Sequence, residues 1–251
     1  MTGNVALRWG ASSSTGLVRK NNEDAGYAGR WLAAVADGLG GHVAGELASA
    51  TVIRAIRAYD VEALTPVLLD TMSHAVRAAS EELHRLVDED PRLTGMGTTL
   101  TAMLWSGDHA ALCQIGDSRA YLLREGRLRQ ITEDHIMGKL VAGAGQLAPV
   151  LTRYLDGRLD RSPDLALREL RRGDRYLLCS DGLTNATERG SIREVLAGVG
   201  GADAAAEGLI GLANANGGPD NITVAIIDVG DPGEAEPPPV PVLLGAAAPA
   251  T

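Results

Sequence analysis

Residues Trp31–Ser49, WLAAVADGLGGHVAGELAS, join a strand, a glycine loop and a helix within one short stretch. The apolar run from Trp31 to Ala36 has the length of a buried strand, and Asp37 follows where that strand should end. Apolar residues then recur at the spacing of one helix face, at Val43, Leu47, Ala48, Val52, Ile56 and Tyr59. A carboxylate followed by flexible glycines allows a side-chain oxygen and bare backbone to reach the same ligand. The stretch therefore predicts a loop that binds a metal ion or a phosphate.

The composition of the chain bounds the class of protein. With 251 residues and a 45% apolar share, the chain suits one domain with a sizeable core. No apolar run approaches the ~18 residues that a membrane span needs, and the start MTGNVALRWG has no secretion signal pattern. Cys113 and Cys179 lie in apolar runs and are interpreted as buried thiols. We expect a cytoplasmic monomer that does not bind a membrane.

The net charge of −9 is unevenly distributed along the chain. No Lys or Arg follows Arg193, whereas eight acidic residues do. The first 193 residues carry 23 basic and 24 acidic side chains and are therefore nearly neutral. Nucleic-acid-binding domains concentrate basic residues, so this balance argues against nucleic acid as a partner.

The order of expected elements predicts the fold class. A second helix is expected from about Pro66 to Val87, and further helices over 192–199 and 204–212. Residues 134–160 have a Gly/Ala-rich centre and predict short helical pieces on either side of it. Strands are expected at 5–9, 97–105, 110–115, 119–123, 127–131, 165–170, 176–179 and 222–229. Strands and helix pairs in this order favour an α+β fold with mostly antiparallel sheets over a regular βαβ alternation.

The end of the chain has a different composition from the rest. Residues 230–251 hold six of the 11 prolines, together with Ala, Gly and acidic residues. Such a segment buries too little apolar surface to offset its ordering entropy. We therefore expect a domain over 1–229 and a disordered tail over 230–251, in which the stretch PPPVP is also compatible with a polyproline II ligand.

Four aspartates occupy matched positions at the ends of apolar strands. They are Asp37, Asp117, Asp181 and Asp220, and each has a glycine one or two positions away. Strand ends within one sheet or sandwich can converge, and converging carboxylates cannot all stay ionised unless a cation neutralises them. Oxygen ligands suit Mg²⁺ or Mn²⁺ better than Zn²⁺, and the sequence contains no His/Cys cluster.

A centre of this kind usually hydrolyses its substrate with a metal-activated water, most often at phosphorus. A phosphate substrate also needs a cationic clamp, and the guanidinium of Arg19 can make a bidentate one. The polar stretch RKNNED, residues 19–24, would otherwise be an ordinary solvated loop.

Six motifs together resemble a known family. They are GLVRKNNEDAGY (16–27), VADGLGGHVAGELAS (35–49), GMGTTLTA (95–102), IGDSRAYLLR (115–124), LCSDGL (178–183) and GGPDNITV (217–224). In order and spacing they are similar to the successive motifs of the PPM-type (protein phosphatase 2C) metal-dependent Ser/Thr protein phosphatases of the bacterial kind. The resemblance spans roughly residues 5–229.

The resemblance implies a fold and a metal centre. The fold would be a four-layer α-β-β-α sandwich, with two mostly antiparallel sheets flanked by helix pairs and a dinuclear Mn²⁺ or Mg²⁺ centre at one end. Asp37 would bridge both metals, the Gly38 carbonyl would serve one of them, and Asp181 and Asp220 would complete the first. Asp117 with Asp181 matches the third, weaker metal site of bacterial members.

The resemblance also implies the chemistry. Arg19 would hold the phosphate, while Glu23 and Asp24 would orient metal waters or Arg19 from a second shell. A metal-bridging water would attack phosphoserine or phosphothreonine in line, without a phosphoenzyme. The expected partners are phosphorylated proteins, either Ser/Thr kinases or the substrates of such kinases, whose action this hydrolase would oppose.

Two departures from the family pattern affect these expectations. Leu39 stands where animal relatives carry a His proposed as the general acid, so proton delivery to the leaving oxygen is unassigned. Bacterial relatives have a longer flap after the segment ITEDH (131–135), with a His-Pro pair before an Arg that Arg153 matches. The flap borders the site, and its shortening bears on specificity and on the third metal.

The sequence is also compatible with two other functions. The shortened flap allows a non-catalytic, metal-dependent module that binds phosphoproteins, although the intact set of acidic residues argues against it. The strand–loop–helix pattern also resembles nucleotide-binding folds, but Gly38, Gly40, Gly41 and Gly45 do not have the G-x-G-x-x-G spacing.

Overall fold

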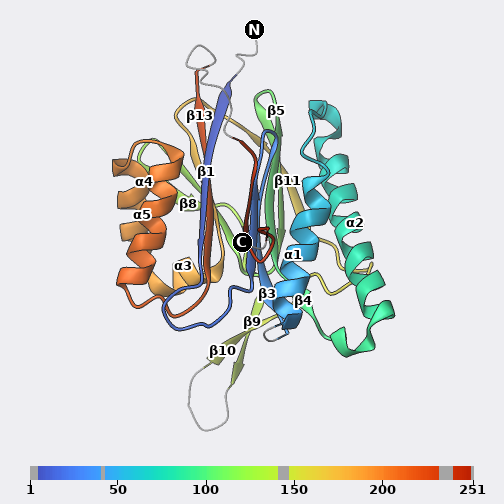
Figure 1. Cartoon of the computed structure of the whole chain (residues 1–251). Coiled ribbons are helices and arrows are strands. Elements are labelled where there is room, and N and C mark those ends of the chain that lie inside the picture. The colour runs from blue at the N-terminus through green and yellow to red at the C-terminus, as the bar shows by residue number, and fades with distance from the viewer. Residues whose placement is uncertain (1–4, 41–42, 141–146, 232–239, 250–251) are drawn as a thin grey trace.

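Two β-sheets packed face to face, with helices on both outer faces, make up the protein (Figure 1). The structure is a computed structural model that describes residues 5–40, 43–140, 147–231 and 240–249. Each strand pairing among these residues is antiparallel. The predicted α+β class and four-layer α-β-β-α arrangement are therefore confirmed.

The first sheet is formed, in spatial order, by β1 (Ala6–Ser14), β13 (Ile222–Gly230), β12 (Arg175–Cys179), β7 (Arg119–Arg124) and β8 (Arg127–Gln130). The second contains β11 (Asp164–Glu169), β6 (His109–Ile115), β5 (Leu100–Ser106), β3 (Leu32–Leu39), β2 (Asp24–Ala28) and β14 (Val242–Gly245). The short β4 (Gly97–Thr98) pairs with Gly38 and Leu39, so β3 continues through Asp37 and ends three residues later than the apolar run.

Helices cover the outer face of each sheet (Figure 1). One side carries α1 (Val43–Arg57) and α2 (Leu68–Glu89), with short 3₁₀ turns η1 (Thr65–Val67) and η2 (Pro91–Leu93) at either end of α2. The other side carries α3 (Asp181–Ala186), α4 (Arg189–Gly198) and α5 (Ala202–Ala215). None of the helices in the described part of the chain is long and apolar enough to span a membrane.

Three clusters of buried side chains hold the four layers together. One lies between the second sheet and the α1–α2 pair and includes Val52 and Ile56, two positions of the predicted apolar helix face. A second lies under α3, α4 and α5, and the third, around Trp105, lies between the two sheets. Cys113 and Cys179 are buried free thiols, as expected. The period-3.6 and period-2 patterns thus identify the faces that meet in the core.

The prediction of a disordered tail over 230–251 is wrong for residues 240–249. Strand β14 pairs with β2, and Ala247 is only 1% exposed. The prediction from composition failed because the edge of β2 supplies backbone hydrogen-bond partners. Four residues are then enough to extend the sheet. Residues 232–239 and 250–251 of that segment lie outside the described residues.

The helical pieces predicted around Ala142–Pro149 are also wrong for the described backbone. Strands β9 (Ile136–Leu140) and β10 (Leu147–Leu151) pair as an antiparallel hairpin, and residues 141–146 lie outside the described residues. The hairpin projects from the end of the sandwich at which β3 ends (Figure 1). The Gly/Ala-rich centre carried no clear period, so composition alone did not distinguish the two structures.

Candidate functional site

One pocket at the end of the sandwich is lined by all the predicted site residues except Asp24. Asp37 comes from β3, Asp117 follows β6, Asp181 opens α3 and Asp220 precedes β13. The pocket has a volume of about 310 Å³ and is lined by Arg19, Glu23, Asp37, Gly38, Leu39, Asp117, Leu151, Asp181, Asp220 and Asn221. Strand ends from both sheets therefore bring together acids that are far apart in the sequence, as their matched settings predicted.

The backbone of Asp37 is held from both sides. Its N–H donates to Oγ1 of Thr99 (2.9 Å), and its carbonyl accepts from the Thr99 N–H (2.9 Å) and the Thr98 hydroxyl (2.8 Å). A Cβ at Gly38 would lie 2.2 Å from the Gly45 carbonyl oxygen, so only glycine lets the start of α1 approach this closely. Thr98 and Thr99, in the motif GTT (97–99), thus hold the backbone of Asp37 in place. The sequence pattern did not indicate this role.

The carboxyl groups of the pocket repel one another, and burial leaves them poorly hydrated. Burial, and then the neighbouring carboxylates, raises the pKa of Asp37 well above its usual range. Burial and the charge of Asp220 raise the pKa of Asp181, an effect that a hydrogen bond with Asp37 opposes. Burial and Asp181 raise the pKa of Asp117 to about 6. A cation would relieve this repulsion.

Asp24 lies directly beneath the pocket, opposite Asp37 in the β2–β3 register. It is 1% exposed, and its Oδ2 accepts a hydrogen bond from the Ser180 hydroxyl (2.7 Å). Burial raises its pKa to about 7. Its Oδ1 is buried and has no hydrogen-bond partner among the described atoms. A buried carboxyl oxygen without a partner fits a group that orients a metal-coordinated water.

Arg19 lies at the rim of the pocket and contacts an aspartate that the resemblance assigns to the metal. Its Nη2 donates to Oδ2 of Asp220 at 2.7 Å, and its side chain is 52% exposed. The hydrogen bond to Asp220 raises the pKa of Arg19. The guanidinium therefore remains charged beside the aspartates, where a phosphate group would also lie.

Asn221 fastens the loop that carries Arg19, and the sequence analysis did not single it out. Its Oδ1 accepts from the Glu23 N–H (2.8 Å), while its Nδ2 donates to the carbonyls of Thr15 and Asn21 (2.9 Å each). The Glu23 carbonyl also accepts a hydrogen bond from Ser49 of α1. The only available signal was the position of Asn221 directly after Asp220.

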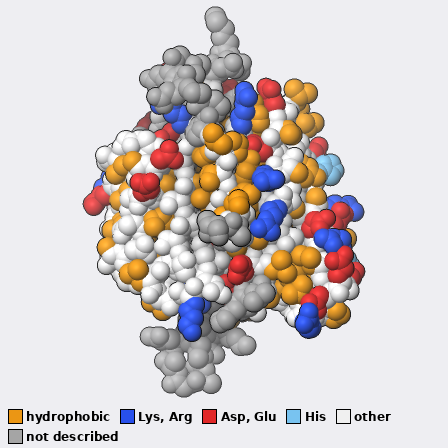
Figure 2. Space-filling model, viewed as in Figure 1, with side chains coloured by type: hydrophobic (Ala, Val, Ile, Leu, Met, Phe, Trp, Pro, Cys, Tyr) orange, Lys and Arg blue, Asp and Glu red, His pale blue; other side chains and the backbone are white. Residues whose placement is uncertain are grey.

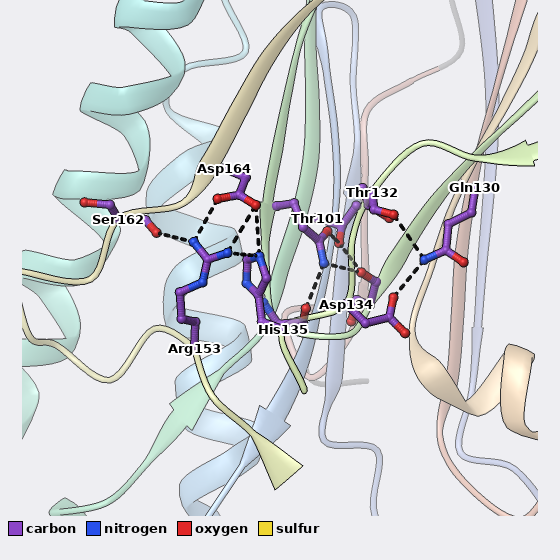
Figure 3. A network of polar contacts seen from close by, with 11 residues as sticks. Thr101, Gln130, Thr132, Asp134, His135, Arg153, Ser162 and Asp164 are labelled. Atoms are coloured by element: carbon purple, nitrogen blue, oxygen red, sulfur yellow. Dashed lines mark hydrogen bonds and ion pairs between the residues drawn. The ribbon is translucent and has the colours of Figure 1, made fainter. Parts of the chain in front are cut away.

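A separate polar network supports the loop of Asp117 (Figure 3). The Gln114 amide donates to the carbonyls of Gly116 (2.9 Å) and Ser118 (2.7 Å), and accepts from the Thr101 hydroxyl. The Gly116 N–H donates to Nδ1 of His135 at 3.1 Å. Asp117 is thus carried on a loop whose flanking peptide groups are fixed from β6, β5 and the segment before β9.

The base of the β9–β10 hairpin joins the same network (Figure 3). Arg153 Nη1 donates to Asp164 Oδ1 at 2.8 Å, and Asp164 Oδ2 lies 3.1 Å from Nε2 of His135. The hairpin also reaches the pocket, because Leu151 of β10 is one of its lining residues. Leu39 and Leu151 both line the pocket, and neither side chain has a proton to donate to a leaving oxygen.

The donor set of the pocket fits hard divalent cations. All the predicted ligands are oxygen atoms, as Mg²⁺ and Mn²⁺ prefer, and a cation would stabilise the repelling carboxylates. Among the described residues, no three His, Cys, Asp or Glu side chains are close enough to hold one ion by themselves. Mg²⁺ usually keeps several waters and is bound through one or two carboxylates, so this spacing is compatible with its coordination.

Known proteins share this sequence pattern. A family model for protein phosphatase 2C matches residues 19–199, a range that includes Arg19, Asp37, Asp117 and Asp181 and ends before Asp220. Serine/threonine protein phosphatase PstP of Mycobacterium tuberculosis is 45% identical over 237 aligned residues, covering 90% of this chain and 46% of PstP. Protein phosphatase PhpP of Streptococcus pneumoniae is 31% identical, covering 87% of this chain and 96% of PhpP.

Solved structures share the fold. The catalytic domain of serine/threonine protein phosphatase PstP, in complex with two manganese ions, matches with a TM-score of 0.82 at 45% identity, covering 90% of this chain and all of that chain. PppA of Pseudomonas aeruginosa matches with a TM-score of 0.80 at 29% identity, also covering 90% of this chain. This chain spans less than half the length of full PstP but all of its solved catalytic domain.

Proposed function

Because this chain belongs to the protein phosphatase 2C family, we propose that it is a metal-dependent hydrolase of phosphoserine and phosphothreonine in proteins. The observation that carries the proposal is the single pocket that holds Asp37, Asp117, Asp181 and Asp220 with Arg19 at its rim. The solved PstP domain with two manganese ions supports a dinuclear Mn²⁺ centre. Mg²⁺ as an alternative metal rests on the oxygen donors of the pocket.

Within this proposal each acidic residue has a defined task. Asp37 would bridge two ions and the Gly38 carbonyl would serve one of them, and both residues lie in β3 and line the pocket. Asp181 and Asp220 would complete the first ion, in part through coordinated waters, and Asp117 with Asp181 would form a third site. Bound cations supply charge neutralisation and lower the pKa of a coordinated water towards neutrality. The buried carboxyl of Asp24 and the loop of Glu23 position the groups around them.

Arg19 binds the phosphate of the substrate in this scheme. Its guanidinium is about half exposed and already pairs with a carboxylate, so it is accessible and held near the aspartates. An incoming phosphate offers the same bidentate acceptor geometry as the Asp220 carboxylate. Substrate binding would therefore replace or share the Arg19–Asp220 contact.

The proposed partners are proteins phosphorylated on Ser or Thr, including Ser/Thr kinases. The name of PstP, a serine/threonine protein phosphatase, supports this class of substrate, and PhpP is named a protein phosphatase. A cytoplasmic location, which rests on the composition of the chain, and a monomeric state are further parts of the proposal.

Hydrolysis of a phosphothreonine peptide with Mn²⁺ present tests the proposal. We expect turnover by the wild-type chain, and its loss in the double variant Asp37→Asn with Asp220→Asn. Asp203→Asn, which changes an exposed aspartate on α5, serves as the control and should keep full activity. Activity that survives in the double variant would contradict the assigned centre. Tight phosphopeptide binding without turnover by the wild type would instead identify a non-catalytic phosphoprotein-binding module.

A further inference from the structure

The strand β14 lies at the edge of the second sheet, far along the chain from the residues that it contacts. It pairs with β2 in the register Val242–Ala28, Leu243–Tyr27, Leu244–Gly26 and Gly245–Ala25. In Figure 1 it lies beside β1 and β2 at the front of the sandwich, and Figure 2 shows hydrophobic side chains gathered over it on that face. The residues matched by the family model end at 199, before this strand begins.

The end of β14 contacts the residue beneath the pocket. The Ala246 N–H donates to the carbonyl of Asp24 at 2.8 Å. Gly245 has a φ of +57°, and a Cβ there would lie 2.1 Å from the same carbonyl oxygen. The chain then turns, with the Ala247 and Ala248 N–H groups donating to the carbonyls of Leu244 and Gly245. This turn lies against the start of β2.

Side chains on both sides of β14 anchor it. Ala247 is buried in the core cluster between the second sheet and the α1–α2 pair, and Leu243 and Ala246 pack against that cluster. Val242 packs against the cluster between the two sheets. The side chain of Leu244 fills the space beside Gly26. The strand therefore contributes to two cores and does not lie loosely on the surface.

Strand β2 lies between β14 and the strand that carries Asp37. One of its edges pairs with β3, where Asp24 is directly opposite Asp37, and its other edge pairs with β14. Without β14, β2 would be an edge strand, and the carbonyl of Asp24 would lose its partner. Its carboxyl group interacts with the side chains of Ser180 and Thr223, but its Oδ1 has no hydrogen-bond partner, so its position also depends on the backbone of β2.

We propose that β14 and the turn after it position Asp24 for the metal centre, so that residues 242–248 contribute to metal affinity. The inference rests on the proposed function, because it assumes that the aspartate pocket binds Mn²⁺. It adds a structural element outside the matched family residues to the set that holds the centre. Groups around a metal site that orient its ligands or waters typically change affinity about 10- to 100-fold when they are removed.

Two glycine variants distinguish a role of β14 in positioning Asp24 from a role in the stability of the fold. Gly245→Val places side-chain atoms against the Asp24 carbonyl, and Gly107→Val is its matched control. Gly107 also has a φ of +57°, but a Cβ there meets nothing within 4 Å, and it lies in the turn between β5 and β6. Both variants thus carry the same backbone strain, and only one disturbs β2. A third variant is a chain that ends at Asp231.

Mn²⁺ binding is measured by calorimetry on the folded chain, well below the unfolding temperature of each variant, together with hydrogen exchange of the β2 amides. We expect Gly245→Val and the shortened chain to bind Mn²⁺ at least about 10-fold more weakly than wild type, with faster exchange in β2. Gly107→Val should match wild type in both measurements. A purely structural role would lower the unfolding temperature and leave the Mn²⁺ affinity unchanged.

Wild-type Mn²⁺ affinity in both Gly245→Val and the shortened chain would overturn the inference and leave the proposed function intact. Equal weakening in Gly107→Val would also overturn it, because general strain would then explain the effect. Failure of the wild-type chain itself to bind Mn²⁺ would instead refute the proposed function together with this inference.

Discussion

Replacing Asn221 with alanine would test whether the loop of Arg19 depends on one buried amide. Asn221 is 6% exposed and makes three hydrogen bonds to the backbone of residues 15–23. At about 1 kcal/mol net for each bond, we expect a loss of about 3 kcal/mol of unfolding free energy. Asn216→Ala is the matched control, since it removes an amide that makes one exposed bond to the Ala186 carbonyl, and it should cost about 1 kcal/mol or less.

The effect of Asn221→Ala on catalysis should act through Arg19. Displacing a substrate-positioning group by about 1 Å can lower the rate about 100-fold, so we expect kcat/KM to fall about 10- to 100-fold. In a double-mutant cycle with Arg19→Ala, the loss caused by Asn221→Ala should largely disappear, because the group that it positions is already absent. Urea unfolding and phosphopeptide kinetics at saturating Mn²⁺ measure the two effects. Additive losses in kcat/KM would refute the reasoning.

Three further predictions concern the aspartate pocket. The raised pKa of Asp117, about 6, means that the metal-free folded chain binds more protons than the unfolded chain between pH 4 and 6. Ionisation of this carboxyl therefore lowers the free energy of unfolding as the pH rises through that window. Asp117→Asn or added Mn²⁺ should remove this pH-dependent contribution, which urea unfolding at each pH measures. Thr99→Val removes the acceptor of the Asp37 N–H, so it should lower the free energy of unfolding by about 1–3 kcal/mol. It should also weaken Mn²⁺ binding in calorimetry. Wild-type values in both measurements would show that Thr99 does not hold Asp37 in place. Gly38→Ala brings a Cβ within 2.2 Å of backbone at the start of α1 and should abolish Mn²⁺ binding, whereas Gly190→Ala in α4, where a Cβ meets nothing within 4 Å, should be neutral or stabilising in thermal unfolding.

Local sequence patterns predicted most of the elements around the pocket. The apolar run before Asp37, the glycine loop and the helix face of α1 are each visible within a few residues, because burial imposes their periods. The aspartates were recognisable for the same reason, since each lies beside an apolar run at or near the end of a buried strand. The resemblance of six motifs to one family then gave these acids an order and a common task.

Features that depend on long-range partners were missed. Asn221 and Thr99 look like ordinary polar residues in the sequence, and their roles appear only when the Arg19 loop and Asp37 lie beside them. Residues 242–245 have no pattern of a strand, yet the unpaired edge of β2 makes them one. Hydrogen bonds between distant backbone segments carry no local periodicity, so no window of sequence could have predicted them.

The sequence by itself determined the class of fold, the carboxylate chemistry of the pocket and the family to which the chain belongs. Each of these follows from the type and spacing of residues, because local burial imposes a period on apolar residues and oxygen donors indicate a hard cation. Only the tertiary structure decided that Asp220 pairs with Arg19, that Asp24 is buried with one oxygen unpartnered, and that the end of the chain closes the sheet beside it. These outcomes depend on which surfaces meet when the two sheets pack, and packing across long sequence separations is set by the whole chain.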